Sequence, residues 1–560
     1  MRNNKNIVFL VIIILLGYSC QSTPKNDPKE APRIVNIINF IRQLEPRDPL
    51  ITEDILYETV YQQILLLRKH SLPGTFLLQY DALINPRYQT LLRNEISPDS
   101  EIGAWWEITQ PHVEAAGIQW RGRYPWDWHA NVGFTTGYTP KEREKLVDVY
   151  MEKYKSIFGK YPSSVGSWFI DAHTLGYMYD KYKIEASCTC KDQIGTDGYT
   201  LWGGYWNQGY YPSKINAYMP AQTEEGQIPV PVFRMLGSDP IYQYDMGLET
   251  SWQGVASLEP VYPESGGNRE WVEYFFKNMF KEPCLAFNYV QAGQENSFTW
   301  EKMKTGLEIQ IPLLDSLKRQ GIIRVETLGE SGRWFRKNFP LTPATSVTVT
   351  TDVKDEGHQT VWYNSRFYRA NLFWEKEAFR IRDIHLFDER MESNYYRNVT
   401  TSNQCTFTTL PFVDGFLWST ANEIAGLRLI KIEANGASVE LPFNNPKIIE
   451  TENGVLLIEG QTENNKTIRI SLSEDEIQMT LNPQDGMLSW ALELRTASKV
   501  VGQLPFKDIS PQTISANMNG FNYKITCPIG SFIKPDTLST FIFQIKPLNH
   551  SLTLNFRERP

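Results

Sequence analysis

Short apolar segments alternate with amphipathic helical segments from Ile34 to about residue 345, and this alternation restricts the fold more than any other feature of the chain. Strands joined by crossover helices pair in parallel. Eight strands are expected: Val35–Phe40, Thr75–Gln79, Ile102–Trp106, Val165–Ile170, Ile184–Ser187, Val230–Phe233, Leu285–Val290 and Ile322–Glu326. The pattern therefore predicts an α/β domain, a (β/α) barrel of seven or eight strands.

Two helices between these strands carry clear boundary signals. Thr139 and Glu142 form a capping box with Pro140 at the first helical position, and Gly159 ends that helix. The other helix runs over residues 52–70, with apolar side chains every three or four positions and a basic C-terminal end. Both fit crossover helices of a barrel.

The pattern changes near residue 345. Apolar residues now alternate with polar ones, as in Thr467–Leu472 and Ile477–Leu481, and Asn, Gly and Asp separate the segments. This predicts an antiparallel β-sandwich after the barrel. The expected organisation is a signal peptide over residues 1–19, a flexible lipidated tether over 20–33, a catalytic barrel over 34–345 and a β-sandwich over 346–560.

The N-terminus has the features of an export signal. Arg2 and Lys5 precede the apolar run Ile7–Leu16, which is shorter than the about 20 residues that a spanning helix needs. The following Leu16-Gly-Tyr-Ser-Cys20 resembles a bacterial lipobox, in which Cys20 carries the lipid. We therefore expect an exported lipoprotein anchored to the membrane and facing the periplasm or the cell surface; the alternative is an ordinary signal peptide with an incidental cysteine.

Composition narrows the function. The chain has 56 Lys and Arg against 64 Asp and Glu, which argues against a nucleic-acid partner. Aromatic residues make up 13% of the chain, with 16 Trp, and flat aromatic faces are typical of sugar sites. Five cysteines follow Cys20, an odd number, so a fully paired disulfide framework is excluded. The expected partners are an oligosaccharide or polysaccharide and a membrane.

Three segments resemble the polysaccharide-deacetylase (NodB-like) superfamily and its glycoside-hydrolase relatives with incomplete barrels. They are Leu65–Leu78, with Leu-Pro-Gly-Thr-Phe before a strand; Glu101-Ile-Gly; and residues 137–142 with Phe158-Gly-Lys-Tyr-Pro162. Together they cover about residues 34–200. The whole chain also resembles two-domain lipoproteins of gut Bacteroidetes, a resemblance that implies no activity.

The chain departs from the metal site that this resemblance implies. The family has an Asp-Asp pair after the first strand, where this chain runs from Asn39 to Glu45 without an aspartate. Its two histidines are replaced here by Trp105 and Thr109. A divalent metal needs several converging ligands, so the sequence predicts no metal and no other cofactor.

Candidate site residues are sought where the barrel strands end, because catalytic groups of such barrels lie there. The segment from Arg121 to His129 is the densest of these, combining cations, a carboxylate, an imidazole and aromatic rings. Gln294-Glu295 and Glu326 end the last two strands. The catalytic candidates are Glu45, Asp48, Asp127, His129 and Asp171. The substrate-binding candidates are Arg42, Arg47, Trp105, Glu107, Arg123, Trp126, His173, Asp192, Trp202, Tyr205, Arg234 and Asp239.

The leading hypothesis is a metal-independent glycoside hydrolase with a paired acid and base. Glu45 or Asp48 would supply one carboxylate, and Asp127, His129 or Asp171 would supply the partner. Arg42, Arg123 and Arg234 are candidates for clamping an anionic sugar. One alternative is a deacetylase whose metal ligands come from Asp48, His129, Asp171 and His173. Another is a glycan-binding lipoprotein without catalytic activity.

Overall fold

The computed structural model describes residues 31–196, 198–451, 454–482, 488–535 and 541–558. The expected signal peptide, Cys20 and most of the expected tether lie outside the described residues. Within the described part, none of the helices combines the length and the apolar character that crossing a membrane requires.

Eight strands of the N-terminal half form a parallel barrel, so the predicted fold class is confirmed. The strands are β1 (Arg33–Ile41), β2 (Thr75–Leu78), β3 (Glu101–Trp105), β4 (Ser164–Gly166), β5 (Ala186–Thr189), β11 (Val232–Arg234), β12 (Asn288–Ala292) and β13 (Arg324–Glu326). Strand β1 pairs with β12 and β13 through its first half and with β2 through its second half. All nine residues of β1 are buried; six of them are apolar, and the polar ones are Arg33, Asn36 and Asn39.

Side chains, and not a strand ladder, join the two ends of this sheet. The edge beside β11 is the short antiparallel strand β8 (Gly209–Tyr210). Gln208 donates from Nε2 to Asn288 Oδ1 and accepts the Tyr289 N–H at Oε1, both at 2.8 Å. Gln291 Oε1 accepts the Leu236 N–H, also at 2.8 Å. The barrel is therefore nearly closed, with a polar seam between β11 and β12.

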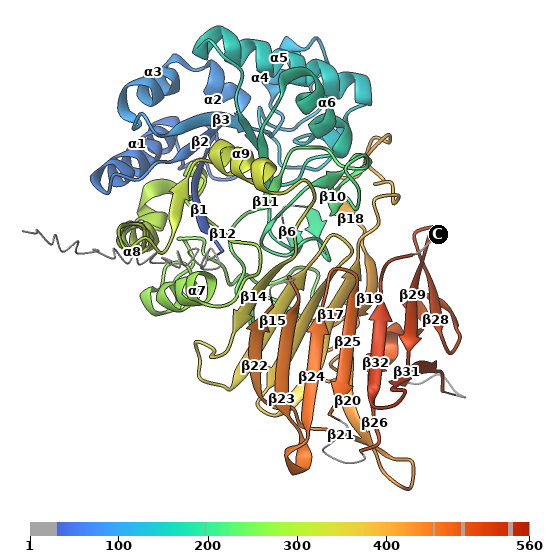
Figure 1. Ribbon diagram of the computed structural model, residues 1–560. Coiled ribbons are helices and arrows are strands. Elements are labelled where there is room, and N and C mark those ends of the chain that lie inside the picture. Colours follow the sequence, from blue (N-terminus) through green and yellow to red (C-terminus); the bar gives the residue numbers. More distant parts are fainter. Residues whose placement is uncertain (1–30, 197, 452–453, 483–487, 536–540, 559–560) are drawn as a thin grey trace, which may run out of the picture.

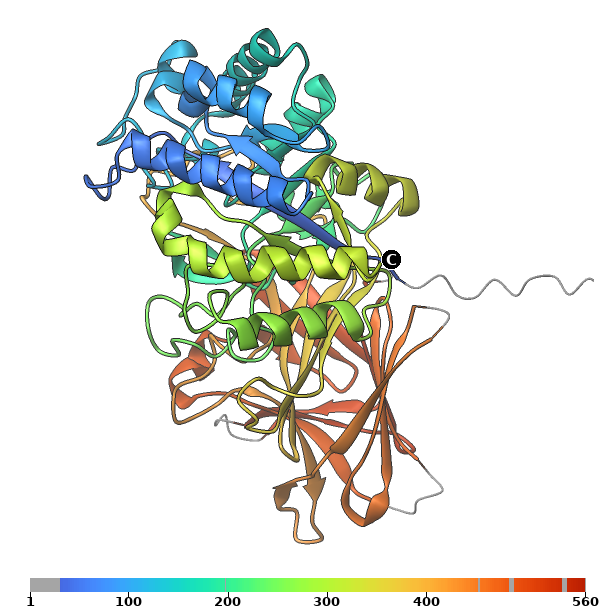
Figure 2. The ribbon, with the colours of Figure 1, turned by 90° about the vertical axis from the view of Figure 1, so that its left-hand side faces the viewer.

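Helices cover the outside of the barrel (Figures 1 and 2). They are α1 (Glu53–Lys69), α2 (Tyr80–Ile84), α3 (Pro86–Glu95), α4 (Gln110–Ala115), α5 (Pro140–Phe158), α6 (Ala172–Tyr182), α7 (Arg269–Lys281), α8 (Thr299–Arg319) and α9 (Leu328–Asn338). Figure 2 shows α1, α8 and α7 side by side on one face. The predicted capping box of α5 is present: Thr139 and Glu142 each accept from the backbone N–H of the other.

Two large antiparallel sheets form the C-terminal half, and the predicted sandwich is confirmed. The first runs in the order β14 (Thr345–Val349), β15 (His358–Asn364), β16 (Tyr368–Glu375), β17 (Ala378–Leu386), β20 (Gly426–Ile432), β26 (Trp490–Arg495), β31 (Phe541–Lys546) and β30 (Ser531–Ile533), with β19 (Leu410–Asp414) on β17 and β21 (Ser438–Glu440) on β20. The second runs in the order β22 (Asn444–Glu450), β23 (Leu456–Gln461), β24 (Thr467–Leu472), β25 (Glu476–Leu481), β32 (Ser551–Asn555), β29 (Phe521–Ile529), β28 (Thr513–Met518) and β27 (Phe506–Ile509).

In the second sheet, the alternation of apolar and polar residues in the sequence matches the alternation of buried and more exposed side chains. In β24, every second side chain is buried, and β25 repeats the pattern with Ile477, Met479 and Leu481. Such strands have one face on the core and one in water. Buried hydrophobic side chains from the barrel half and from the sandwich share one cluster, whereas others of the barrel, such as Phe40 and Trp105, belong to a second cluster.

A long insertion between β5 and β11 packs against the β domain and connects it to the barrel. It holds β6 (Gln193–Thr196), β7 (Tyr199–Leu201), β9 (Pro212–Ser213) and β10 (Asn216–Pro220), and β18 (Cys405–Phe407) of the β domain pairs in parallel with β7. Trp206 of the insertion stacks on Trp362 of β15, with ring centroids 4.3 Å apart. The two domains therefore share an extensive buried junction.

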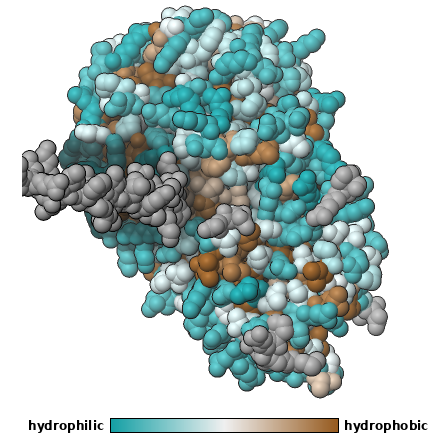
Figure 3. Space-filling model, viewed as in Figure 1, coloured by the Kyte–Doolittle hydropathy of each residue, from teal (hydrophilic) through white to brown (hydrophobic). Residues whose placement is uncertain are grey.

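The face seen in Figure 3 is mostly hydrophilic, with hydrophobic side chains in separate small patches. Several of the exposed large hydrophobic residues are far apart in the chain, such as Leu50, Trp252 and Leu548. Isolated exposed apolar side chains of this kind are normal on soluble domains.

Candidate active site

Charged and polar side chains from four strands meet at the carboxyl end of the barrel. Arg42 directly follows β1, Gln79 follows β2, Glu107 lies two residues beyond β3, and Glu295 lies three residues beyond β12. Parallel strands of a barrel end at the same rim, so residues distant in sequence become neighbours there.

Arg42 is the centre of this group. Its Nε lies 2.8 Å from Glu107 Oε2 and its Nη2 lies 2.6 Å from Glu107 Oε1, a bidentate pairing. Its Nη1 lies 2.8 Å from Glu295 Oε2 and 3.1 Å from Ser297 Oγ. Arg42, Glu107 and Glu295 are all at least 95% buried. One guanidinium thus pairs with two buried carboxylates.

Glu107 accepts two further hydrogen bonds. Gln79 Nε2 donates to Oε2 and Trp168 Nε1 donates to Oε1, each at 2.8 Å. With the two bonds from Arg42, each oxygen therefore accepts two donors. Glu107 is fixed in place and acts as a support for Arg42.

Glu295 is held less completely. Ser297 Oγ donates to its Oε1 at 2.6 Å, and Oε2 lies in the ion pair with Arg42 Nη1 at 2.8 Å. Burial raises the pKa of Glu295 above its ordinary value, and the nearby Arg42 and Arg47 only partly oppose this. The Glu295 carboxyl can therefore carry a proton at a higher pH than an ordinary glutamate.

Glu45 belongs to the same group, and its pKa is shifted in the opposite direction to that of Glu295. Arg47 donates from Nε to Glu45 Oε1 at 2.8 Å and from Nη2 to Oε2 at 2.7 Å. Burial acts to raise the pKa of Glu45, but the hydrogen bonds from Arg47 and the charges of Arg47 and Arg42 outweigh it and hold the pKa below its ordinary value. Glu45 is thus an ionised carboxylate that shares the neighbouring cations Arg42 and Arg47 with Glu295.

Aromatic rings cover the group on its outer side. The guanidinium carbon of Arg42 lies 4.2 Å from the Trp126 ring centroid, and that of Arg47 lies 5.1 Å from the same ring. Arg47 also lies 5.6 Å from the ring of Trp128, which is half-buried. Stacked arginines and indoles of this kind form a layer between the buried carboxylates and solvent.

The segment Arg123–His129, which carries Trp126 and Trp128, is held in place by contacts of Asp127. Arg123 donates from Nε and Nη2 to both oxygens of Asp127, at 2.9 and 2.8 Å. The backbone N–H of His129 also donates to Asp127, at 3.2 Å. These contacts outweigh the effect of burial and lower the pKa of Asp127 to about 2. Asp127 shapes the loop that positions Trp126 and Trp128.

Two of the predicted residues lie in a separate cluster. Asp171 is the N-cap of α6, and its Oδ1 lies 2.9 Å from Arg143 Nη1. The hydroxyls of Thr135 and Thr174 donate to Oδ2, so both oxygens are occupied. His173 lies 3.1 Å from Glu144 instead. Asp171 and His173 thus belong to the packing of α5 and α6.

Several further candidates lie at the domain junction. Asp192 accepts from Arg234 Nη2 at 2.8 Å and also pairs with Arg369 of β16. Trp202 donates to Asp414 of β19 at 3.0 Å. Two other candidates are bound in the same region: Tyr205 contacts Thr345, and Asp239 accepts from Trp271. They connect the barrel to the sandwich or to α7, away from Arg42.

Among the described residues, Trp105 and Asp48 make no hydrogen bond to the Arg42 group, although the Trp105 ring packs edge-on against Trp168 at 5.2 Å. Trp105 is fully buried inside the barrel, stacked 4.2 Å from Phe40. Asp48 accepts the backbone N–H of Leu50 at 3.0 Å in the loop after β1.

Gln79 and Trp168 are members of the group that the sequence analysis did not single out. Each lies just beyond the end of a strand, Gln79 one residue after β2 and Trp168 two residues after β4. The signal that marks both is their place in the sequence: each is a polar or aromatic residue within two positions of the predicted carboxyl end of a strand. Neither residue type is distinctive enough to be noticed otherwise.

The barrel rim does not fit the divalent metal of the resembling family. The first position after β1 is the cationic Arg42, whose charge repels a metal ion. Asp48, His129, Asp171 and His173 are each bound to different neighbours, as described above. No converging ligand set is therefore formed from these four residues.

Elsewhere in the described residues, Asp352, Glu356 and His358 form one group whose potential ligand atoms lie within 4.8 Å of one another. Asp352 Oδ1 already accepts the backbone N–H of Lys354 and Glu356, and Oδ2 accepts that of His358 at 2.7 Å. These bonds are those of a tight turn, and they explain the grouping without a metal.

Comparisons with known proteins give matches among solved structures. No family model matches the chain, and no curated protein matches it. A protein from Parabacteroides distasonis, provisionally described as a glycoside hydrolase/deacetylase, is 15% identical over 67% of this chain and 88% of its own, with a TM-score of 0.49.

Two other matches are provisionally described as polysaccharide deacetylases. The one from Mycobacterium smegmatis is 12% identical over 57% of this chain and 96% of its own, with a TM-score of 0.33. The one from Pseudomonas aeruginosa PAO1 is 12% identical over 58% and 98%, with a TM-score of 0.36.

Proposed function

We propose that this protein is a carbohydrate-active enzyme that cleaves a glycosidic bond at the carboxyl end of its barrel, with Glu295 as proton donor and Glu45 as the ionised carboxylate. One observation carries this proposal. The two carboxylates flank Arg42 and Arg47, and their environments move their pKa values in opposite directions. Such a pair is what acid and base roles in glycoside hydrolysis require.

The neighbouring residues have supporting roles in this proposal. Glu107 fixes Arg42, and Arg42 in turn fixes the Glu295 carboxylate. Trp126 and Trp128 supply aromatic faces of the kind that stack on sugar rings. The solved structures reported above bear names of enzymes that act on glycans, which is the same broad class.

Access to Glu295 is part of the proposal. The residue is only 3% exposed, and the Arg47 and Trp126 layer lies over the group. A sugar must therefore displace this layer, and its aromatic faces then contact the sugar. Exclusion of water on binding would strengthen the electrostatic effects inside the site.

The test is an oligosaccharide panel incubated with the purified chain and read by mass spectrometry. Once a cleaved glycan is found, Glu295→Gln and Glu45→Gln should each lower kcat by about 100-fold or more, as loss of an acid or base does. Glu58→Gln, on the exposed face of α1, is the matched control and should retain full activity.

Three outcomes would contradict the proposal. Binding of glycans without any product would favour the non-catalytic alternative. Loss of acetyl groups from an intact glycan chain would favour the deacetylase alternative. Retention of full activity by both glutamine variants would show that the chemistry occurs elsewhere.

A further inference from the structure

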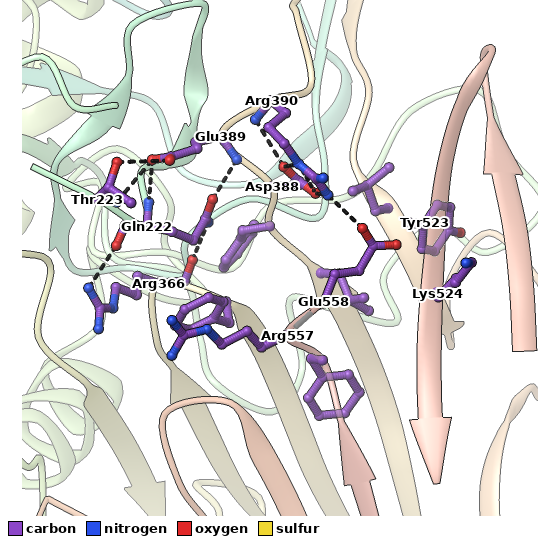
Figure 4. A pocket seen from close by; sticks show the side chains of 15 residues that line it. Gln222, Thr223, Arg366, Asp388, Glu389, Arg390, Tyr523, Lys524, Arg557 and Glu558 are labelled. Atoms are coloured by element: carbon purple, nitrogen blue, oxygen red, sulfur yellow. Dashed lines mark hydrogen bonds and ion pairs between the residues drawn. The ribbon is translucent and has the colours of Figure 1, made fainter. Parts of the chain in front are cut away.

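A cavity of about 340 Å³ lies where the barrel insertion meets both sheets of the β domain (Figure 4). Its walls come from the segment after β10, from the residues just before β16, and from the end of β17 and the residues after it. Residues of β29 and the residues just after β32 complete them. None of the carboxylates of the barrel rim lines it. The volume falls within the range of small-molecule sites.

The inner surface of this cavity is apolar and aromatic. Phe367, Tyr523 and Phe556 line it, and each is at least 94% buried. The Tyr523 hydroxyl is turned to Pro411 O at 2.7 Å, so its ring presents an apolar surface. A ligand with a ring or another apolar face can therefore pack there.

One wall is held rigidly by hydrogen bonds. Glu389 Oε2 accepts the backbone N–H of Gln222 at 2.8 Å and that of Thr223 at 3.0 Å. Arg366 donates to Gln222 O at 2.7 Å, as drawn in Figure 4. The cavity therefore exists before any ligand binds, which reduces the entropic cost of binding.

Two cations at its mouth have no carboxylate partner among the described residues. Arg557 and Lys524 are both exposed, and the Arg557 guanidinium carbon lies 5.3 Å from the Phe367 ring. The other two cations differ, since Arg366 pairs with Glu474 and Arg390 pairs with Asp388 and Glu558. Arg557 and Lys524 are thus free to receive an anion.

The charge of the lining limits the ligand. Of the four cationic side chains that line the cavity, Arg366 and Arg390 are already paired with carboxylates, which leaves Arg557 and Lys524 for an anionic group of a ligand. Inorganic phosphate has no apolar face that could pack against Phe367, whereas a ring that carries a carboxylate has both features. A guanidinium fork pairs well with a carboxylate. We propose that this cavity binds a small cyclic monocarboxylate of the uronic-acid class, with its carboxylate at Arg557 and Lys524 and its ring against Phe367.

The test is calorimetric titration of the full chain with glucuronate, glucose and inorganic phosphate. Glucuronate should bind, while glucose and phosphate should bind at least tenfold more weakly. The double variant Arg557→Gln, Lys524→Gln should weaken glucuronate binding at least tenfold. Lys507→Gln, an exposed cation of β27 outside the cavity, should bind as the unsubstituted protein does.

Three results would overturn the inference: no binding of glucuronate, equal binding by the double variant, or tighter binding of phosphate. All the substituted side chains are exposed, and circular dichroism would show that the variants remain folded. The barrel variant Glu295→Gln should bind glucuronate in this cavity unchanged. Failure of the proposed catalysis and failure of this site are therefore separate results.

Discussion

Arg42 donates to both carboxylate oxygens of Glu107, from Nε to Oε2 at 2.8 Å and from Nη2 to Oε1 at 2.6 Å, and both residues are buried from solvent. An ion pair in such a site loses the hydration of both partners, so it adds little net stability compared with an apolar pair. Removing one partner alone is far more costly, because the other charge remains buried.

The first prediction follows from this asymmetry. Arg42→Met leaves Glu107 and Glu295 without their shared cation, and it should lower the free energy of unfolding by about 3–5 kcal/mol at pH 7. Urea denaturation measures the change. Arg68→Met, which removes an exposed partner of Glu95, is the control and should cost less than about 1 kcal/mol. Equal effects of the two substitutions would contradict the buried triad.

The second prediction concerns the pH dependence of activity. A proton donor must be protonated to act, and burial raises the pKa of Glu295 above 4.5. Activity should therefore persist above pH 4.5 and fall as the pH rises through the raised pKa of Glu295. The profile of kcat/KM against pH reports this limb. The residual activity of Glu295→Gln should lack it; an unchanged limb would assign the acid role to another group.

The third prediction concerns the domain junction. His385 Nδ1 lies 3.0 Å from Asp383 and Nε2 lies 3.4 Å from Asp414, and the cation Arg369 also pairs with Asp383. Burial and Arg369 lower the pKa of His385, but the two carboxylates outweigh them and raise it to about 9.

A histidine with a raised pKa binds its proton more tightly in the folded state. Its contribution is fully present below pH 6.5 and is lost as the pH rises through about 9. The loss should be of the order of 3 kcal/mol, at about 1.4 kcal/mol per pKa unit. Urea denaturation from pH 6 to 10 measures it. His385→Gln should abolish this slope, whereas His550→Gln, far along the chain in the β domain, should keep it.

The fourth prediction tests the backbone that positions Glu295. Gly293 has a φ of +89°, and a Cβ atom added there would lie 2.3 Å from Ile38 O. Gly293→Ala should therefore lower both the unfolding free energy, by more than about 1 kcal/mol, and the activity. Gly321→Ala, also at positive φ but with open space around it, should cost only the backbone strain. Similar effects at both positions would show that the contact with β1 is unimportant.

The sequence was sufficient for the architecture because periodicity reports which faces are buried. All eight barrel strands were predicted, although β4 is shorter than expected and β12 begins three residues later and ends two residues later than expected. The insertion after β5 was not predicted, since its strands have two to five residues and lack a periodic pattern.

The site was less predictable, because the distance between two residues along the chain does not show whether their side chains form an ion pair in the folded structure. Arg42, Glu45, Arg47 and Glu107 were singled out and do lie near one another. Asp171 and Asp192 also follow strands, yet arginines from α5 and β16 bind them. Arg143 and Arg369 lie far from these aspartates in the chain, so no local pattern reveals the pairing.

The seam at Gln208 and Gln291 makes closure of the barrel depend on two amide side chains. Gln208 offers a donor and an acceptor to β12, as the peptide groups of a neighbouring strand would, and Gln291 of β12 accepts the Leu236 N–H. A hydrogen-bonded ladder tolerates almost any residue, whereas this joint depends on the residue type at two positions. A single substitution at either glutamine is therefore enough to weaken the closure of the barrel.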